Sequence, residues 1–457
     1  MGAIFATMRV LLVQAFTALD LELVYPIGLS MLAAHLPSEH VVEIFDVNLH
    51  RHLDDPYAPL RDKLQGFRPD CVGISLRNIK VATPGLHTDD FEPQQKTVAL
   101  VRELCPEALI VAGGTAFSLY AEAFMKRLPQ LDVGLWGEGE HRFARLLEDP
   151  TQAEAIPGLW LRTPKLHYTG TPPSLNFGAL KPYRKDLLDF KPYTDSSFVS
   201  VGIQSKRGCA LHCVHCSDTF LLGNAVRRRS VKDVVDEMQV LREEHGVKQL
   251  FFCDQIFNIP VGHAIDICRE IVDRRLDVRW SAWFNEKANT LPDELIIWLK
   301  RAGCGLLSFS PDHVDDRMLR NLDKNFRYKD LVYTYKLAKK HDIDVEYSFF
   351  LNAPGEDWRS LYSILKFVTE AKLHCGPNFR LFTLLMMQPI RIYPHSRLHQ
   401  LAVETGLVDR DADLITGQFW NPGGLSYAVA GIQATAQTAY RLRRRYKTLI
   451  GAGPATV

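Results

Sequence analysis

Short apolar runs alternate with amphipathic stretches over residues 8–150. Each run is four or five residues long, and the stretches between them repeat their apolar positions every three or four residues, as helices do. This alternation predicts an α/β domain with a doubly wound, Rossmann-like parallel sheet. The predicted strands are at residues 10–13, 41–45, 71–75, 109–112 and 133–136, and the predicted helices are at 27–35, 60–67, 94–104 and 120–128.

Small and polar residues follow these strands at the end where such sheets bind ligands. Glycines there let the backbone approach a large flat ligand and let N–H groups face phosphates. Each group alone also fits an ordinary turn, but their joint placement predicts a bound ligand. The residues are Gln14 after the first strand, Ser75 and Arg77 after the third, Gly113, Gly114 and Thr115 after the fourth, and Gly137, Glu138, Gly139 and Glu140 after the fifth.

A second alternation of strands and helices occupies residues 198–408. Its six β/α units predict an incomplete (β/α)6 parallel barrel with its site at the carboxyl ends of the strands. Residues 151–197, rich in Pro, Tyr and Lys, predict a linker, and residues 409–457 predict a short helical region with a helix at 430–447. The predicted barrel strands are at residues 199–203, 250–252, 278–280, 306–309, 345–349 and 381–385.

Composition limits the classes of partner. The chain has 457 residues, enough for two or three domains, and 54 Lys and Arg balance 53 Asp and Glu to give a net charge of +1. No global field attracts nucleic acid or an anionic membrane, and no apolar run has the length that spans a bilayer. Nine cysteines without a secretory signal indicate a reducing cytoplasm and argue against a disulfide framework. We expect a cytoplasmic protein that acts on small molecules.

Three cysteines directly after the first predicted barrel strand carry the chemistry. Cys209, Cys213 and Cys216 form a C-x3-C-x2-C loop. Three thiolates on one turn can ligate three irons of a [4Fe–4S] cluster and leave the fourth iron open for a substrate or cofactor. A structural zinc site would use four ligands in C-x2-C pairs, and three core thiols would not lie among Lys206, Arg207 and the other polar residues here.

With this loop after the first strand of a six-unit barrel, the chain resembles the radical S-adenosylmethionine (SAM) superfamily. The N-terminal blocks at residues 26–36, 69–75, 112–115 and 137–140 resemble the cobalamin-binding domain fused to one subset of that family. The resemblance extends to about residue 408. It implies a [4Fe–4S] cluster held by Cys209, Cys213 and Cys216, together with SAM and cobalamin as cofactors.

The same resemblance implies that polar residues after three barrel strands contact SAM. Asp254 and Gln255 follow the second strand, where the family contacts the amino group, and Ser308 and Ser310 lie by the fourth, near the carboxylate or ribose. Asn352 begins the turn after the fifth strand, which passes close to the adenine. Residues of these types also cap strands and turns without touching a ligand.

One departure from the family concerns cobalt. The D-x-H-x-x-G segment that supplies a histidine to cobalt is missing. Residues 46–50 come nearest to this pattern but do not match it. The lower face of cobalt would then be open, or met by water or by a side chain such as Arg77. A cation there would disfavour a sixth ligand, whereas the alternative is that Arg77 pairs with the corrin periphery or with Asp20 or Glu22. A second departure is His215, where the family often has an aromatic carbocycle.

The resemblance implies a cobalamin-dependent radical SAM methyltransferase. It would move a methyl group from SAM through methylcobalamin to a carbon of a natural-product precursor in antibiotic biosynthesis, for example the indole C2 of tryptophan, by a radical or a polar route. Flavodoxin or ferredoxin would supply electrons. Glu286 could bind an amine or act as the base, or could merely pair with Lys287. The alternatives are a cyclase or ring-rearranging enzyme that does not methylate, and a non-catalytic sensor.

Overall fold

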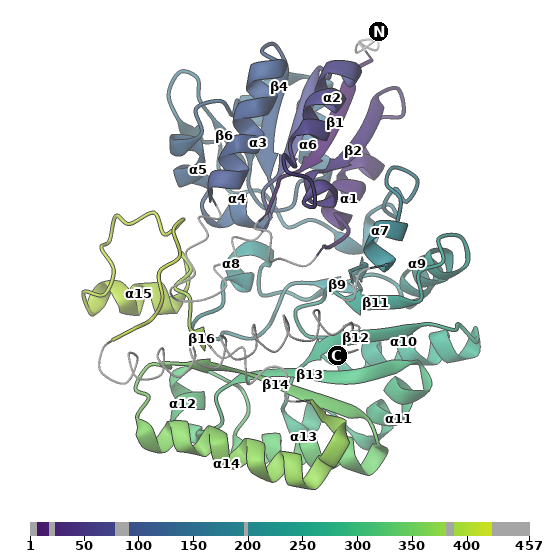
Figure 1. Ribbon diagram of the computed structural model, residues 1–457, viewed down its shortest axis with the longest axis vertical. Coiled ribbons are helices and arrows are strands. Elements are labelled where there is room, and N and C mark those ends of the chain that lie inside the picture. The colour runs from purple at the N-terminus through teal and green to yellow at the C-terminus, as the bar shows by residue number, and fades with distance from the viewer. Residues whose placement is uncertain (1–6, 18–22, 78–90, 196–199, 381–387, 423–457) are drawn as a thin grey trace.

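The N-terminal sheet has the strand order β2-β1-β3-β4-β5-β6-β7, and the first five of these strands are parallel. The computed structural model describes residues 7–17, 23–77, 91–195, 200–380 and 388–422. Helices cover both faces of this sheet (Figure 1), which explains why its strands are almost continuously apolar. The strands are β1 (Arg9–Gln14), β2 (Val41–Asp46), β3 (Cys71–Ser75), β4 (Leu109–Gly113), β5 (Val133–Leu135), β6 (Leu159–Leu161) and β7 (His167–Tyr168). The helices are α1 (Ile27–His35), η1 (Val47–His50), α2 (Ala58–Phe67), α3 (Phe91–Leu104), α4 (Thr115–Leu119), α5 (Ala121–Arg127), α6 (Glu140–Glu148) and η2 (Pro150–Ala155).

The segment predicted as a linker contributes to this sheet. β6 pairs antiparallel with β5, and β7 pairs antiparallel with β6, so the sheet continues to Tyr168. These strands have three and two residues, too few for a periodic pattern to show in the sequence. The described residues of this segment also contain most of η2 and the short helices η3 (Phe177–Ala179) and α7 (Lys191–Thr194).

The second sheet is parallel and follows chain order, β8-β11-β12-β13-β14-β15, with β16 beside β14. The predicted α/β class, with six β/α units after a Rossmann-like domain, is confirmed. The predicted strand at residues 381–385 and the predicted helix at 430–447 lie outside the described residues. The strands are β8 (Gly202–Ile203), β11 (Gln249–Phe252), β12 (Arg279–Phe284), β13 (Cys304–Asp312), β14 (Asp344–Leu351), β15 (Phe379–Arg380) and β16 (Gln388–Pro389), and the antiparallel ribbon is β9 (Lys206–Arg207) with β10 (Arg227–Arg228).

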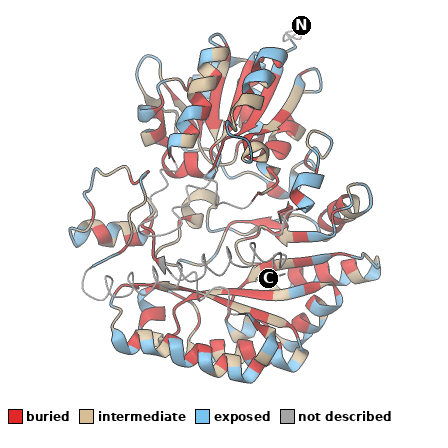
Figure 2. Ribbon diagram, viewed as in Figure 1, coloured by how far each residue is buried: buried red, intermediate tan, exposed pale blue. Residues whose placement is uncertain are grey.

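Helices follow the strands of this sheet and bury one face each against it (Figure 2). The ring of Tyr347 stacks on Phe309 at 5.3 Å and meets Phe367 edge-on at 5.1 Å, so Tyr347 belongs to the helix-facing core rather than to a substrate pocket. The helices are α8 (Asp218–Leu222), α9 (Val231–Glu243), α10 (Val261–Asp273), η4 (Ala288–Thr290), α11 (Asp293–Arg301), α12 (Asp316–Asn321), α13 (Tyr328–His341), α14 (Trp358–Cys375), η5 (Gly376–Asn378) and α15 (Arg397–Glu404).

One irregularity in this sheet bears on the site. Phe309 of β13 pairs with Tyr347, and Asp312 pairs with Phe349. Between these two pairs β13 advances by three residues and β14 by two. This is a β-bulge with one extra residue. Asp312, with φ of 65°, ends the bulged strand.

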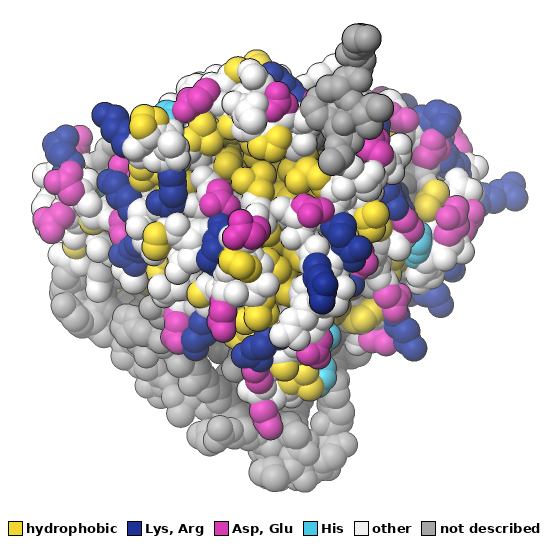
Figure 3. Space-filling model, turned by 90° about the horizontal axis from the view of Figure 1, so that it is seen from above, with side chains coloured by type: hydrophobic (Ala, Val, Ile, Leu, Met, Phe, Trp, Pro, Cys, Tyr) yellow, Lys and Arg dark blue, Asp and Glu magenta, His cyan; other side chains and the backbone are white. Residues whose placement is uncertain are grey.

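The surface matches the near-zero net charge. Seen from the N-terminal domain, positive and negative side chains are interspersed around apolar ones (Figure 3). Within the described ranges, no helix combines the length and apolar character needed to cross a bilayer.

Asp357 begins α14, the longest helix described. Its Oδ1 accepts hydrogen bonds from the N–H groups of Arg359 (3.0 Å) and Ser360 (2.9 Å), and these bonds, with the Arg317 ion pair, lower its pKa to about 2. A carboxyl whose pKa is lower in the folded state than in the unfolded state stabilises the folded protein at pH values above its unfolded pKa. This contribution is lost as the pH falls toward 2.

We therefore expect Asp357→Ala to lower the thermal unfolding midpoint by roughly 2 °C at pH 7, and by less below pH 4. Asp357→Asn keeps a side chain able to cap and is the matched control. Equal midpoints for the wild type and Asp357→Ala at pH 7 would contradict the capping role.

Candidate functional site

The cysteine loop connects the two strands of the β9–β10 ribbon. Gly208 has φ of 95°, and a side chain there would collide with the Ala225 carbonyl. The loop is closed by Cys209 N–H donating to Gly223 O (3.2 Å) and by Val214 N–H donating to Leu322 O (3.1 Å). All three loop cysteines are free thiols that are partly exposed. The backbone thus holds three reactive sulfurs on one short loop.

The three sulfurs line one cavity of about 250 Å³. Its wall comes from the carboxyl ends of β11, β12 and β13, where a parallel barrel presents its site. Aromatic and polar groups both line it, as in many small-molecule sites. Besides the cysteines, the lining includes Gln255, Ile256, Trp283, Phe284, Asn285, Glu286, Ser310, Asp312, Lys324 and Phe326.

The thiols do not form a site for a single metal ion. In the part of the chain that the structure describes, no three His, Cys, Asp or Glu side chains converge closely enough to hold one. A cluster distributes its protein ligands over separate irons, so the open arrangement of three cysteines suits it. The zinc alternative would need a fourth ligand and a tetrahedral centre.

Lys324 and Asp312 form a buried ion pair in the cavity wall. Lys324 Nζ also donates to Ser310 O at 3.0 Å, and Ser310 Oγ donates to Asp312 Oδ1 at 2.9 Å. His215 Nε2 lies 3.4 Å from Asp312 Oδ2, but burial lowers the pKa of His215 to about 4, so the ring is neutral. This network neutralises its own charge, and Glu286 and Asp218 are the acids of the wall that lie outside it.

Glu286 is 3% exposed, and its Oε1 has no hydrogen-bond partner. Burial raises the pKa of Glu286 to about 8, against the opposing field of Lys324. The Oε1 of Gln255 is likewise buried and unpartnered in the same cavity. Unpartnered buried acceptors are costly unless a ligand supplies donors. The cavity therefore fits a ligand with N–H groups or positive charge, such as the ammonium of SAM, beside a thiolate-bound cluster.

The structure places Asp254 elsewhere. Asp254 is 2% exposed and does not line the cavity. Its carboxylate accepts hydrogen bonds from Ser205 N–H (2.8 Å), Ser205 Oγ (2.5 Å) and Lys206 N–H (3.2 Å), with Lys206 Nζ 3.7 Å away. Asp254 thus ties the end of β11 to the segment that leads into the cysteine loop. Its neighbour Gln255 is the residue of this pair that reaches the cavity.

Ser308 and Asn352 are also outside the cavity lining, whereas Ser310 is part of it. Ser308 Oγ donates to Glu346 Oε1 at 2.7 Å on the adjacent strand. Asn352 has φ of 62°, and its N–H donates to Glu356 Oε2. Sequence position alone could not distinguish these serines, since both lie on the same strand.

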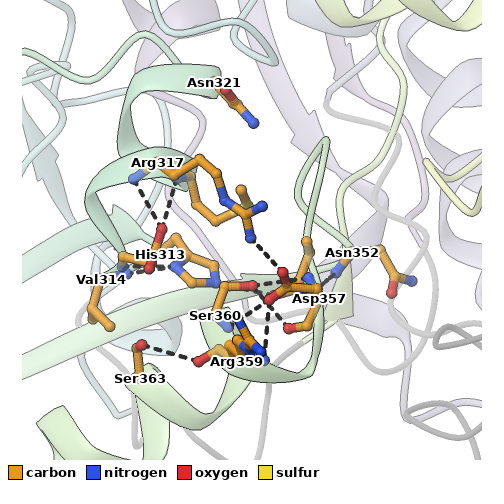
Figure 4. Close-up of polar contacts among 12 residues, drawn as sticks. His313, Val314, Arg317, Asn321, Asn352, Asp357, Arg359, Ser360 and Ser363 are labelled. Carbon is orange, nitrogen blue, oxygen red and sulfur yellow. Dashed lines mark hydrogen bonds and ion pairs between the residues drawn. The ribbon is translucent and has the colours of Figure 1, made fainter.

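A histidine fixes the turn that contains Asn352 (Figure 4). His313 Nδ1 accepts from the N–H groups of Val314 (2.8 Å) and Asp315 (2.9 Å), so Nδ1 carries no proton. The Nε2–H then donates to Glu356 Oε1 at 3.0 Å. His313 therefore orients the carboxylate that accepts the Asn352 N–H in its left-handed conformation.

Residues from three strands meet at the carboxyl edge of the N-terminal sheet, where the sequence predicts bound cobalamin. In the sheet register Gln14 pairs with Ser75, and Ser75 pairs with Gly113, so residues at three strand ends lie side by side. Gly114 has φ of 99°, and a Cβ there would lie 2.7 Å from Leu76 O. Thr115 begins α4. Among the described residues, Ser75, Gly113 and Gly114 give this edge small side chains and a close backbone approach, which suits a large flat ligand.

We expect Gly114→Ala to destabilise the protein by about 2 kcal/mol and to reduce the corrin retained on purification, because both the positive φ and the close carbonyl oppose a side chain. Gly66→Ala, at a helical position of α2 with nothing within 4 Å, is the control. Equal urea midpoints and equal corrin content for the two variants would contradict this.

Arg77 lies two residues beyond β3, at the same edge. It is near enough to Asp46 and to Cys253 to lower the pKa of both groups, although burial is the larger influence and raises each. Asp46 itself accepts a hydrogen bond from Tyr193 OH at 2.8 Å. The proposed effect of Arg77 on cobalt stays a prediction.

Glu138 and Glu140 form ion pairs with arginines of the second domain. Glu138 pairs with Arg207 and Arg227, and Glu140 pairs with Arg207. Gly137 N–H donates to Ser118 Oγ at 2.8 Å, and a Cβ on Gly139 would meet Leu135 and Leu32. The sequence placed these residues at a strand end but did not reveal their partners, which are about 70 to 90 residues away in the chain.

Sequence reasoning also missed Asp312 and Lys324. Asp312 follows Ser310 at the end of a predicted strand, a position that could have suggested it. Lys324 lies in a short connection between α12 and α13 and has no local signal. Only the tertiary structure brings its ammonium to Asp312.

Known proteins match both halves of the chain. The model of the radical SAM superfamily matches residues 203–368, and that of the B12 binding domain matches residues 19–147. An uncharacterized methyltransferase of Pyrococcus horikoshii is 26% identical over 389 residues, 84% of this chain and 79% of that protein. Tryptophan 2-C-methyltransferase of Streptomyces laurentii is 26% identical over 360 residues, 64% of this chain and 59% of that protein.

The fold resembles a solved structure of the radical SAM methyltransferase TsrM from Kitasatospora setae with cobalamin and a [4Fe–4S] cluster bound. The TM-score is 0.75 at 21% identity, and the match covers 89% of this chain and 76% of that chain. The two family matches coincide with the two domains built above, the cysteine loop lying in one and the glycine-lined sheet edge in the other. The chain therefore combines a B12 binding domain with a radical SAM domain, and this combination implies a [4Fe–4S] cluster, SAM and cobalamin as its cofactors.

Proposed function

We propose that this enzyme transfers a methyl group from SAM to a carbon atom of a small molecule bearing an amino group. The observation that carries this proposal is the cavity that joins the three cysteines to the unpartnered Glu286 and Gln255. When bound, the cluster, SAM and cobalamin supply reducing power and a transferable methyl group. The methyltransferases among the relatives support this reaction class.

The cysteine loop also lies against the cobalamin-binding domain, which supports the same proposal. α8 begins two residues after Cys216, and its Phe220 ring meets Trp136 at 5.5 Å, just beyond β5. The carboxyl edges of the two sheets therefore share one region, where the protein can exclude water from the reacting groups.

Within the cavity, Glu286 orients the substrate or accepts its proton. A carboxyl with a pKa of about 8 is suited to exchange a proton near neutral pH. Trp283 and Phe326 supply apolar walls against which an aromatic ring can pack. Tryptophan is the first substrate to test, because one relative acts on it.

The test is anaerobic incubation with SAM labelled in its methyl group, a flavodoxin or ferredoxin reductant, and candidate amino acids. Methyl transfer predicts labelled product and S-adenosylhomocysteine by mass spectrometry. A cyclase or ring-rearranging enzyme predicts a modified substrate without the label, and that outcome would refute methyl transfer. Formation of 5′-deoxyadenosine distinguishes the radical from the polar route.

If Arg77 keeps the lower face of cobalt free of a ligand, we expect Arg77→Ala to lower the rate of methyl transfer by about tenfold while changing the affinity for cobalamin far less. Arg77→Lys preserves the charge and is the control. Equal losses of rate and affinity would indicate that Arg77 serves only to bind the corrin.

A further inference from the structure

A buried set of four charged side chains joins the two domains beside the cysteine loop. Arg207 Nη1 lies 2.9 Å from Glu138 Oε1 and 2.7 Å from Glu140 Oε1, and Arg227 Nη1 lies 2.6 Å from Glu138 Oε2. We call these four residues the arginine–glutamate cluster. The glutamates come from the segment between β5 and α6, and the arginines come from β9 and β10.

The cluster is balanced and shielded from water. The four side chains are between 6% and 15% exposed, and two positive charges face two negative ones. Burial by itself would raise the pKa of Glu140, but Arg207 outweighs it and the pKa is lowered. Removing one partner of such a pair leaves a buried charge without compensation, which is strongly unfavourable.

The cluster holds both ends of the cysteine loop. Arg207 precedes the loop, Arg227 follows it, and the two are register partners in the β9–β10 ribbon. Arg207 also donates to Met31 Sδ of α1 at 3.2 Å and lies 4.5 Å from the centre of the Phe177 ring. The loop is therefore fastened to three separate segments that precede the second sheet.

We propose that Arg207 is a positioning residue that sets where the cysteine loop lies relative to the cobalamin-binding sheet, with Glu138 and Glu140 as its counter-ions. Two cofactors on different domains react only when their separation is fixed, and an error of 1 Å in such a geometry can cost about 100-fold in rate. The expected effect of Arg207 on the rate rests on the proposed function. Its effect on the position of the cysteine loop can be measured without any turnover.

The experiment compares Arg207→Met with Arg229→Met in the enzyme loaded with its cofactors. Arg229 is a matched control because its Nη2 forms a similarly buried pair with Glu237 at 3.0 Å, wholly within the second domain. The first readout is amide hydrogen exchange of residues 208–226. The second is the separate measurement of kcat and of KM for SAM, with S-adenosylhomocysteine as product.

We expect Arg207→Met to accelerate exchange in residues 208–226 by about tenfold or more. It should lower kcat by about 100-fold with KM for SAM nearly unchanged, because the cysteine loop would change its position but keep its bound cofactors. Arg229→Met should change neither quantity by more than about threefold. Arg207→Lys keeps the charge but loses the planar fork, so it should restore part of the loss.

Equal exchange and equal kcat in Arg207→Met and Arg229→Met would overturn the proposal. Should Arg207→Met fail to fold, Arg207→Lys and Glu138→Gln replace it, and unchanged exchange in both variants would overturn it as well. If the wild type forms no S-adenosylhomocysteine, the proposed function fails, whereas the exchange comparison still decides the role of Arg207.

Discussion

Replacing Cys209, Cys213 and Cys216 together by alanine is expected to remove the iron–sulfur absorbance and all turnover, while cobalamin remains bound. The thiols line a cavity and are only partly buried, so their loss should not unfold the protein. Corrin content is expected to persist because the sheet edge that holds it lies in the other domain. Iron and sulfide analysis, the visible spectrum and corrin content are the measurements.

Cys105→Ser is the matched control, since Cys105 lies at the end of α3, away from the cavity. This variant should retain iron and activity. Full iron occupancy in the triple alanine variant would show that the cluster is held elsewhere, and the assignment of the cavity would fail with it.

Glu286→Gln is expected to lower turnover by at least about 100-fold while leaving all three cofactors bound. Glutamine keeps the shape of the side chain but can neither take up a proton nor carry charge. Glu370→Gln, which alters an acid hydrogen-bonded by Tyr328 far from the cavity lining, is the control. Wild-type turnover in Glu286→Gln would remove Glu286 from the mechanism.

The same variant has a signature in stability that requires no cofactor. Because the pKa of Glu286 is raised to about 8 in the folded chain, the folded state binds this proton more tightly than the unfolded state. The stabilisation is complete below the unfolded pKa of about 4.3 and is lost as the pH rises through 8, an effect on the order of 5 kcal/mol.

In the cofactor-free protein, wild type should therefore lose urea resistance between pH 6 and pH 9 more steeply than Glu286→Gln. Parallel losses in the two proteins would show that Glu286 does not titrate in this range.

The sequence predicted most of the fold because its strands are apolar runs between amphipathic helices. α1 and β3 have the expected bounds, whereas β6 and β7 were missed because strands of two or three residues show no periodic pattern. A hydrophobic pattern in the sequence reports only local structure. Short antiparallel strands such as β6 and β7 form because they pair with a strand elsewhere in the chain.

In the candidate site too, local sequence identified some residues, and only the tertiary structure identifies the others. The cysteine loop is contiguous, so its spacing could be read from the sequence. Gln255, Glu286 and Ser310 line the same cavity, and their contacts with SAM or substrate stay predictions. Asp254 follows a strand end as a ligand residue would, but its carboxylate faces Ser205 and Lys206. Which of two adjacent side chains faces a cavity depends on tertiary contacts.

Because β13 contains one extra residue, the direction of the Asp312 side chain depends on the number of residues in this strand. Asp312 lines the cavity, while its register partner Phe349 packs on Phe367 in the helix layer at 6.1 Å. Deleting one residue between Phe309 and Asp312 would restore regular alternation and turn the carboxylate into that apolar layer, leaving Lys324 without its counter-charge. We therefore expect this protein to tolerate substitutions along this strand better than an insertion or deletion within it.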